Sequence, residues 1–168
     1  MELVKRKSNR LKEFDYSSAG YYFITVCTKD KQKILCDIDD NNSVGGGAHD
    51  APQVILSDYG KIVQKYILST KNIKGISVDK YVIMPNHIHG IFVVDENYGT
   101  SRAPSPTNNA VSLAVGAIKR LVNKEIGTNI WQRSFHDHII RNEEDYLKIW
   151  QYIHTNPAQW KDDCFYLE

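Results

Sequence analysis

The feature that most constrains the fold is a pair of strand-like segments separated by two residues. Residues 76–84 and 87–95 are rich in β-branched and aromatic side chains, and Pro85 and Asn86 stand between them. Such a pair indicates a tight turn, and strands joined by so short a connection pair antiparallel. Because an isolated hairpin is unstable in water, the sequence predicts a larger antiparallel sheet.

Further strands are expected around this hairpin. Residues 21–28 (YYFITVCT) predict a buried strand, and residues 31–37 predict a short partner for it. Two more short strands are expected over 130–135 and 138–141. The strands alternate irregularly with helices, which favours the α+β class, in which helices pack on one antiparallel sheet.

Apolar residues at helical spacing predict helices over 58–70, 111–126 and 143–155. Ser57 and Asn142 are suited to cap the first and the last of them, and Gly127 to end the second. The last helix is expected to bury a stripe made of Tyr146, Ile149, Trp150 and Ile153.

A length of 168 residues suits one domain spanning residues 1–168. The polar stretches 39–53 and 96–110 are interpreted as loop excursions within it, because their flanks are too short to fold alone. With 42% hydrophobic residues the chain can bury a core, and it has no apolar run long enough to span a membrane. The basic first 12 residues lack a following apolar segment, so a cytoplasmic location is expected. Three scattered cysteines are interpreted as reduced thiols.

The net charge of +1 does not by itself indicate a nucleic-acid-binding protein, but the charge is unevenly distributed. Residues 1–12 carry five basic side chains against Glu2, a local balance of 5 − 1 = +4, and residues 112–124 carry three basic side chains and no acid. Local fields of this kind attract polyanions, although they also occur on ordinary solvated faces.

His87 and His89 are the strongest candidates for a metal site. On a strand, alternate side chains share a face, so both imidazoles are expected to point the same way, together with Ile91 and Val93. Two imidazoles in this arrangement can bind one divalent ion. The alternative is a pair of surface histidines. A His-x-His-x-His nucleotide hydrolase is disfavoured because residue 91 is isoleucine.

Tyr152 and Asn156 lie four residues apart on the last predicted helix, at the border of its buried stripe. A phenol and an amide in that position can reach a groove beside the helix. The alternatives are that Tyr152 packs in the core and that Asn156, followed by Pro157, only ends the helix.

Two motifs together resemble a known family. PNHIHGIF is similar to the His-hydrophobe-His motif of the HUH superfamily, and WQRSFHDHIIRNEEDYLKIWQYIHTNPAQW is similar to the C-terminal signature of single-tyrosine transposases. The nearest subgroup is the REP-associated tyrosine transposases, relatives of small insertion-sequence transposases. The resemblance covers roughly residues 10–158. It implies a ferredoxin-like HUH fold with an antiparallel sheet.

The resemblance also implies roles for individual residues. His87 and His89 match the metal ligands, Tyr152 matches the nucleophile, and Asn156 matches the third ligand, for which many relatives have glutamine. The cofactor would be Mg²⁺ or Mn²⁺. The activity would be cleavage and rejoining of single-stranded or hairpin DNA, with palindromic repeats as candidate targets, through a 5′-phosphotyrosine.

Contacts to this DNA are expected from basic residues, and a homodimer is one assembly that the sequence allows. The candidate phosphate-binding residues are Arg10, Lys119, Arg120 and Arg133. The aromatic residues Tyr21, Tyr22, Trp131 and Phe135 could stack on bases or pack in the core. Three alternatives remain open: a replication initiator or relaxase-type nuclease, a non-catalytic nucleic-acid-binding domain, and a domesticated transposase.

Overall fold

The computed structural model describes residues 18–39, 52–96, 98 and 110–166, and its centre is a four-stranded antiparallel sheet. The strands follow the order β4-β5-β1-β6. Their bounds are Ile76–Met84 for β4, His87–Val94 for β5, Gly20–Cys27 for β1 and His136–Ile140 for β6. The predicted hairpin is confirmed, because β4 and β5 pair directly and Met84 lies opposite His87.

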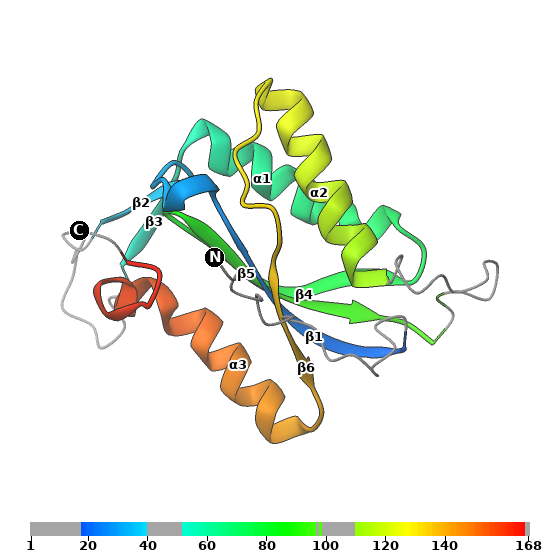
Figure 1. Ribbon diagram of the computed structural model, residues 1–168. Coiled ribbons are helices and arrows are strands. Elements are labelled where there is room, and N and C mark those ends of the chain that lie inside the picture. The colour runs from blue at the N-terminus through cyan, green and yellow to red at the C-terminus, as the bar shows by residue number, and fades with distance from the viewer. Residues whose placement is uncertain (1–17, 40–51, 97, 99–109, 167–168) are drawn as a thin grey trace, which may run out of the picture.

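Three α-helices cover the two faces of this sheet (Figure 1). Helices α1 (Asp58–Leu68) and α2 (Ala110–Ile126) lie on one face, and α3 (Glu143–Thr155) lies on the other. The path β1-α1-β4-β5-α2-β6 is that of a ferredoxin-like fold, so the predicted α+β architecture is confirmed. None of the helices in the described ranges is both long and apolar enough to cross a bilayer.

The helix boundaries follow from local chemistry. The Ser57 side chain accepts a hydrogen bond from the Gly60 amide, and Asn142 accepts one from the Asp145 amide, so both predicted N-caps are confirmed. Gly127 follows α2 with a φ of 84°, a conformation that glycine adopts without strain.

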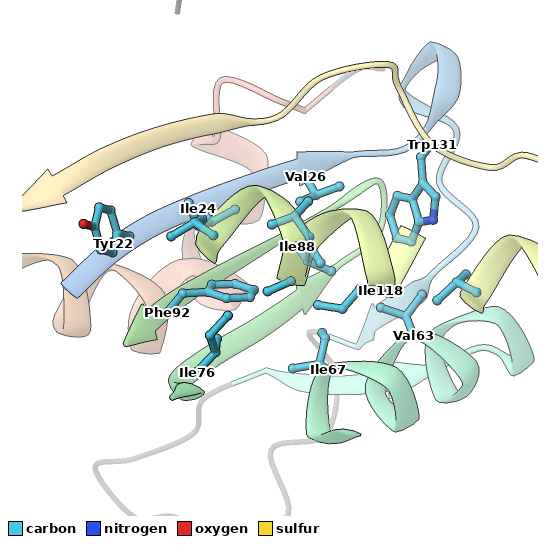
Figure 2. Packing of buried hydrophobic residues seen from close by; sticks show 14 of the residues in the cluster. Tyr22, Ile24, Val26, Val63, Ile67, Ile76, Ile88, Phe92, Ile118 and Trp131 are labelled. Carbon is cyan, nitrogen blue, oxygen red and sulfur yellow. The ribbon is translucent and has the colours of Figure 1, made fainter. Parts of the chain in front are cut away.

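Side-chain alternation along β5 divides the hydrophobic residues between the two faces. Ile88 and Phe92 belong to the larger cluster, where Ile67 of α1 and Ile118 of α2 pack against the sheet (Figure 2). Ile91 points to the opposite face and packs with Ile140 and Ile153 under α3. His87 and His89 occupy the same alternate positions as Ile91, so this division places them on the α3 side.

Two predicted strands need correction. Residues 31–37 are not one strand, because Lys31 ends a 3-10 helix and β2 covers Cys36–Asp39. Strand β2 pairs with β3 (Gln53–Leu56), so the ends of the predicted 39–53 loop form a two-stranded ribbon. Of the predicted 130–135 strand, only the bridge between Thr28 and Trp131 forms.

Three further predictions differ from the structure in detail. The first helix ends at Leu68 and continues as the 3-10 helix Ser69–Asn72. Strand β6 begins at His136, two residues before the predicted strand, because it pairs with β1 from that position. Trp150, which was predicted to be buried, is 37% exposed, and the amine of Lys80 lies 4.1 Å from the centre of its indole ring. Residues 40–51, 97 and 99–109 of the two polar stretches lie outside the described residues, as does Arg10.

Candidate active site

Strand β5 aims both histidine side chains at one point beneath α3. The Nε2 atoms of His87 and His89 lie 2.9 Å apart. On the other side of each ring, Nδ1 of His87 contacts the Asn86 amide oxygen at 2.8 Å, and Nδ1 of His89 contacts the Thr25 hydroxyl at 2.8 Å. Asn86 in turn donates to the Phe165 carbonyl, which fixes its amide so that the oxygen faces His87. The Nδ1 atom of His87 therefore carries the proton, and its Nε2 atom presents a lone pair.

Burial keeps both imidazoles uncharged. His87 is 0% exposed and His89 is 2% exposed. Removal from water lowers the pKa of His87 to about 3, with a smaller contribution from the charge of Lys31. Burial also lowers the pKa of His89 well below its usual value, and the neighbouring His87 adds to this effect. Neutral imidazoles are the form in which histidine binds metal ions.

Helix α3 brings Tyr152 to the same point. The Tyr152 hydroxyl lies 3.2 Å from Nε2 of His89, and its ring contacts the rings of His89 and Phe23. The side chain is partly buried in the small cluster under α3. Burial raises the pKa of Tyr152 to about 12, and the charge of Asp163 adds to the rise. The phenol is therefore protonated at neutral pH.

Asn156 and Asp163 complete the group. Asn156 begins the 3-10 helix Asn156–Asp162, is 1% exposed, and donates from Nδ2 to Oδ2 of Asp163 at 2.8 Å. That bond fixes the amide orientation, because the reverse orientation would place two oxygens together. Oδ2 of Asp163 also lies 3.4 Å from the Tyr152 hydroxyl and 3.9 Å from Nε2 of His87. The last contact is no ion pair, since the imidazole is neutral.

These side chains fit a divalent cation. The Oδ1 atom of Asn156 is buried and has no hydrogen-bond partner among the described residues, which leaves an acceptor unsatisfied. Octahedral bonds of about 2.1 Å place neighbouring ligand atoms about 3 Å apart, close to the 2.9 Å between the two Nε2 atoms. Imidazole together with amide oxygen suits Mn²⁺ or Mg²⁺ with remaining open positions.

Comparison with known proteins assigns this chain to a family. Residues 16–156 match the model of a family described as "Transposase IS200 like". The chain belongs to the IS200-like transposase family. It is 33% identical to an uncharacterized protein of Haemophilus influenzae over 97% of this chain and 94% of that protein. It is 27% identical to a REP-associated tyrosine transposase of Escherichia coli over 64% of this chain and 59% of the relative.

A solved structure supports the same fold. The chain resembles a REP-associated tyrosine transposase bound to a REP hairpin, with a TM-score of 0.63 and 22% identity over 90% of this chain and 73% of that one. The expectation that the sequence belongs among relatives of the REP-associated tyrosine transposases is thereby confirmed.

The end of the described chain covers the histidines of this transposase. The Phe165 ring lies 4.6 Å from the His87 ring and 6.0 Å from the His89 ring, measured between centroids. Trp160 lies 6.0 Å from His87 on the same measure. These rings help to shield both histidines from solvent.

Three of the predicted phosphate-binding residues are described by the structure, and they lie outside the strand and helices that form the site. Lys119 of α2 donates to the carbonyls of Gln132 and Ser134 at 2.7 and 2.8 Å. Burial lowers the pKa of Lys119 to about 8. Arg120 of α2 and Arg133 are exposed. Their contact with DNA stays a prediction.

The aromatic residues divide by position. Tyr22 and Trp131 are buried in the larger core cluster, and Phe135 packs against it. Tyr21 alone of the four is exposed, at 44%. Core packing is therefore the role of Tyr22 and Trp131.

Sequence reasoning did not identify three neighbours of the histidines. Thr25 contacts His89 only because β1 pairs with β5 in a register that sets the two residues opposite each other. Asn86 was interpreted as a turn residue, although its place next to His87 offered a signal. Asp163 lies beyond the helical pattern, and no local pattern in the sequence marks it.

Proposed function

We propose that this transposase nicks and rejoins single-stranded or hairpin DNA through a covalent bond between Tyr152 and a 5′ phosphate. The observation that carries the proposal is the position of the Tyr152 hydroxyl, 3.2 Å from Nε2 of His89. The same Nε2 atom lies 2.9 Å from Nε2 of His87. A nucleophile and two metal-binding groups thus meet at one point of one chain.

The reaction exchanges one phosphodiester for another. The Tyr152 oxygen forms a bond to phosphorus, and the bond from phosphorus to the 3′ oxygen of the preceding nucleotide breaks. The phenol loses its proton, and the departing 3′ oxygen gains one. The products are a 5′-phosphotyrosine and a free 3′ hydroxyl. Because one phosphodiester bond forms for each one that breaks, a second 3′ hydroxyl can reverse the step and join two strands without a nucleotide triphosphate.

His87, His89 and the unsatisfied Oδ1 atom of Asn156 would hold a Mg²⁺ or Mn²⁺ ion. When bound, this ion would neutralise the charge of the phosphodiester and orient it for attack. The protein prepares the site by fixing the orientation of each ligand. Asn86 and Thr25 hold the imidazoles from their far sides, and Phe23 stacks against His89.

The substrate is inferred from the site and from the relative. Because bending duplex DNA costs free energy, a site beneath α3 favours a single strand or the flank of a hairpin. The structural relative with a bound REP hairpin supports the second form. Tyr152 and both histidines belong to the same chain, which supports cleavage by one subunit. A homodimer stays a prediction about assembly.

The test uses hairpin oligonucleotides with single-stranded flanks of randomised sequence, labelled at the 3′ end. A 5′-phosphotyrosine retains the 3′ fragment, so the wild-type protein with Mn²⁺ should carry the label on a denaturing gel. Tyr152→Phe should carry none while keeping the wild-type circular dichroism. His87→Ala, or chelation with EDTA, should also abolish the labelled band.

Tyr146→Phe provides the matched control. Tyr146 lies on the same helix, but its hydroxyl donates to Asp79 at 2.6 Å and takes no part in the proposed site. This variant should form the labelled band as the wild type does. A band of undiminished intensity with Tyr152→Phe would refute the assignment of the nucleophile, and DNA binding without any covalent product would favour a non-catalytic role.

A further inference from the structure

Asp163 presents a buried carboxylate to the proposed metal site. Its side chain is 1% exposed, although it comes from the last turn that the structure describes. One ligand atom from each of His87, His89 and Asp163 can be chosen so that all three lie within 4.8 Å of one another. Such a spacing allows a single ion to contact all three groups.

The buried carboxylate of Asp163 has no lysine or arginine partner at ion-pair distance among the described residues. In the part of the chain that the structure describes, the basic side chain within ion-pair distance of it is His87, at 3.9 Å. Burying a carboxylate costs free energy, and a nearby cation together with hydrogen bonds offsets that cost best. A divalent ion between the histidines and Asp163 would supply the missing charge.

Hydrogen bonds already orient this carboxylate toward the histidines. The Phe165 amide donates to Oδ1 at 2.7 Å, and Nδ2 of Asn156 donates to Oδ2 at 2.8 Å. Oδ2 therefore faces the space between Tyr152 and His87. A carboxylate held by outer hydrogen bonds is typical of a metal ligand, whose partners fix its orientation.

We propose that Asp163 is an anionic ligand of the divalent cation, together with His87, His89 and Asn156. This proposal rests on the proposed function and adds a fourth protein ligand to the site. A carboxylate favours hard ions such as Mn²⁺ and Mg²⁺ over Zn²⁺, which two imidazoles alone would accept readily. Asp163 thus sets the metal preference.

A metal ion bound to Asp163 would also be coupled to the position of residues 163–166. The amide of Phe165 and the carboxylate of Asp163 are hydrogen-bonded, and Phe165 covers His87. An ion that binds Asp163 therefore stabilises residues 163–166 in their observed position. By linkage, the ordering of these residues tightens ion binding to the same extent.

The test measures Mn²⁺ binding to the metal-free full-length protein, with free Mn²⁺ followed by electron paramagnetic resonance. Asp163→Asn is expected to weaken binding at least about tenfold, since loss of an outer-shell partner alone weakens binding by that factor. Asp163→Ala is a second variant. The matched control is Asp162→Asn, which removes the same charge from the neighbouring exposed residue and should bind as the wild type does.

Competition with Zn²⁺ shows whether Asp163 is a metal ligand or only supports the structure of the site. Loss of a carboxylate ligand should weaken Mn²⁺ more than Zn²⁺, whereas general loosening of the site would weaken both equally. The proposal is overturned if the Asp163 variants lose Mn²⁺ and Zn²⁺ affinity equally. It is also overturned if both variants bind Mn²⁺ as tightly as Asp162→Asn does. The proposed function would survive either of these outcomes, provided that the wild type binds Mn²⁺ and His87→Ala does not. Failure of the wild type to bind Mn²⁺ refutes both.

Discussion

Lowering the pH from 7.0 to 5.5 is expected to destabilise the metal-free protein, because His87 is folded as a neutral imidazole. Burial lowers its pKa from 6.5 to about 3, so only the unfolded chain gains a proton as the pH falls through 6.5. The contribution of His87 to the free energy of unfolding is therefore present above pH 6.5 and is lost progressively as the pH falls below it. Integration over this range gives a loss of about 1 kcal/mol for His87 alone. His89, whose pKa burial also lowers, adds to the loss.

Urea denaturation in EDTA at several pH values measures this loss. With a urea dependence of about 2 kcal/mol per molar, the contribution of His87 moves the midpoint by about 0.5 M. His87→Gln should lose that contribution, so its midpoint should change less with pH than that of the wild type. His154→Gln removes an exposed imidazole and should keep the wild-type dependence. Equal pH dependence of wild type and His87→Gln would refute a buried neutral His87.

Further predictions concern packing and thiols. Gly60→Ala should destabilise the fold by about 3 kcal/mol or more, because its Cβ would lie 2.0 Å from a main-chain carbonyl oxygen. Gly116→Ala, with nothing within 4 Å of the added carbon, should instead stabilise α2 by up to about 1 kcal/mol, and urea denaturation measures both. Burial raises the pKa of all three thiols, to about 11 for Cys27 and about 12 for Cys36, but of the three only Cys164 is exposed. A thiol reagent should therefore modify one cysteine rapidly in the native protein and all three only in denaturant.

Much of the site could be predicted because its geometry is local. The two-residue period of a strand is sufficient to place His87 and His89 on one face, and the helical period is sufficient to place Tyr152 beside Asn156. That the histidine strand and the tyrosine helix meet was inferred from the family resemblance. The structure brings the Tyr152 hydroxyl within 3.2 Å of His89.

The features that could not be predicted depend on contacts between distant segments. Asp163 reaches the histidines only because the chain turns back after α3, and Asn156 meets it there. The start of β6 is set by its pairing with β1 rather than by its own polar sequence. Trp150 fits the apolar pattern of α3, yet it is 37% exposed and contacts Lys80 of β4.

The most direct test of the central claim is the site of covalent attachment. The wild-type protein is incubated with Mn²⁺ and a hairpin oligonucleotide, treated with nuclease, digested with trypsin and analysed by mass spectrometry. Cleavage after Lys148 and Lys161 yields a peptide of residues 149–161, in which Tyr152 is the only tyrosine. We predict that this peptide carries a nucleotide mass on Tyr152. Attachment to a different peptide, or DNA cleavage with no peptide modified, would contradict the account.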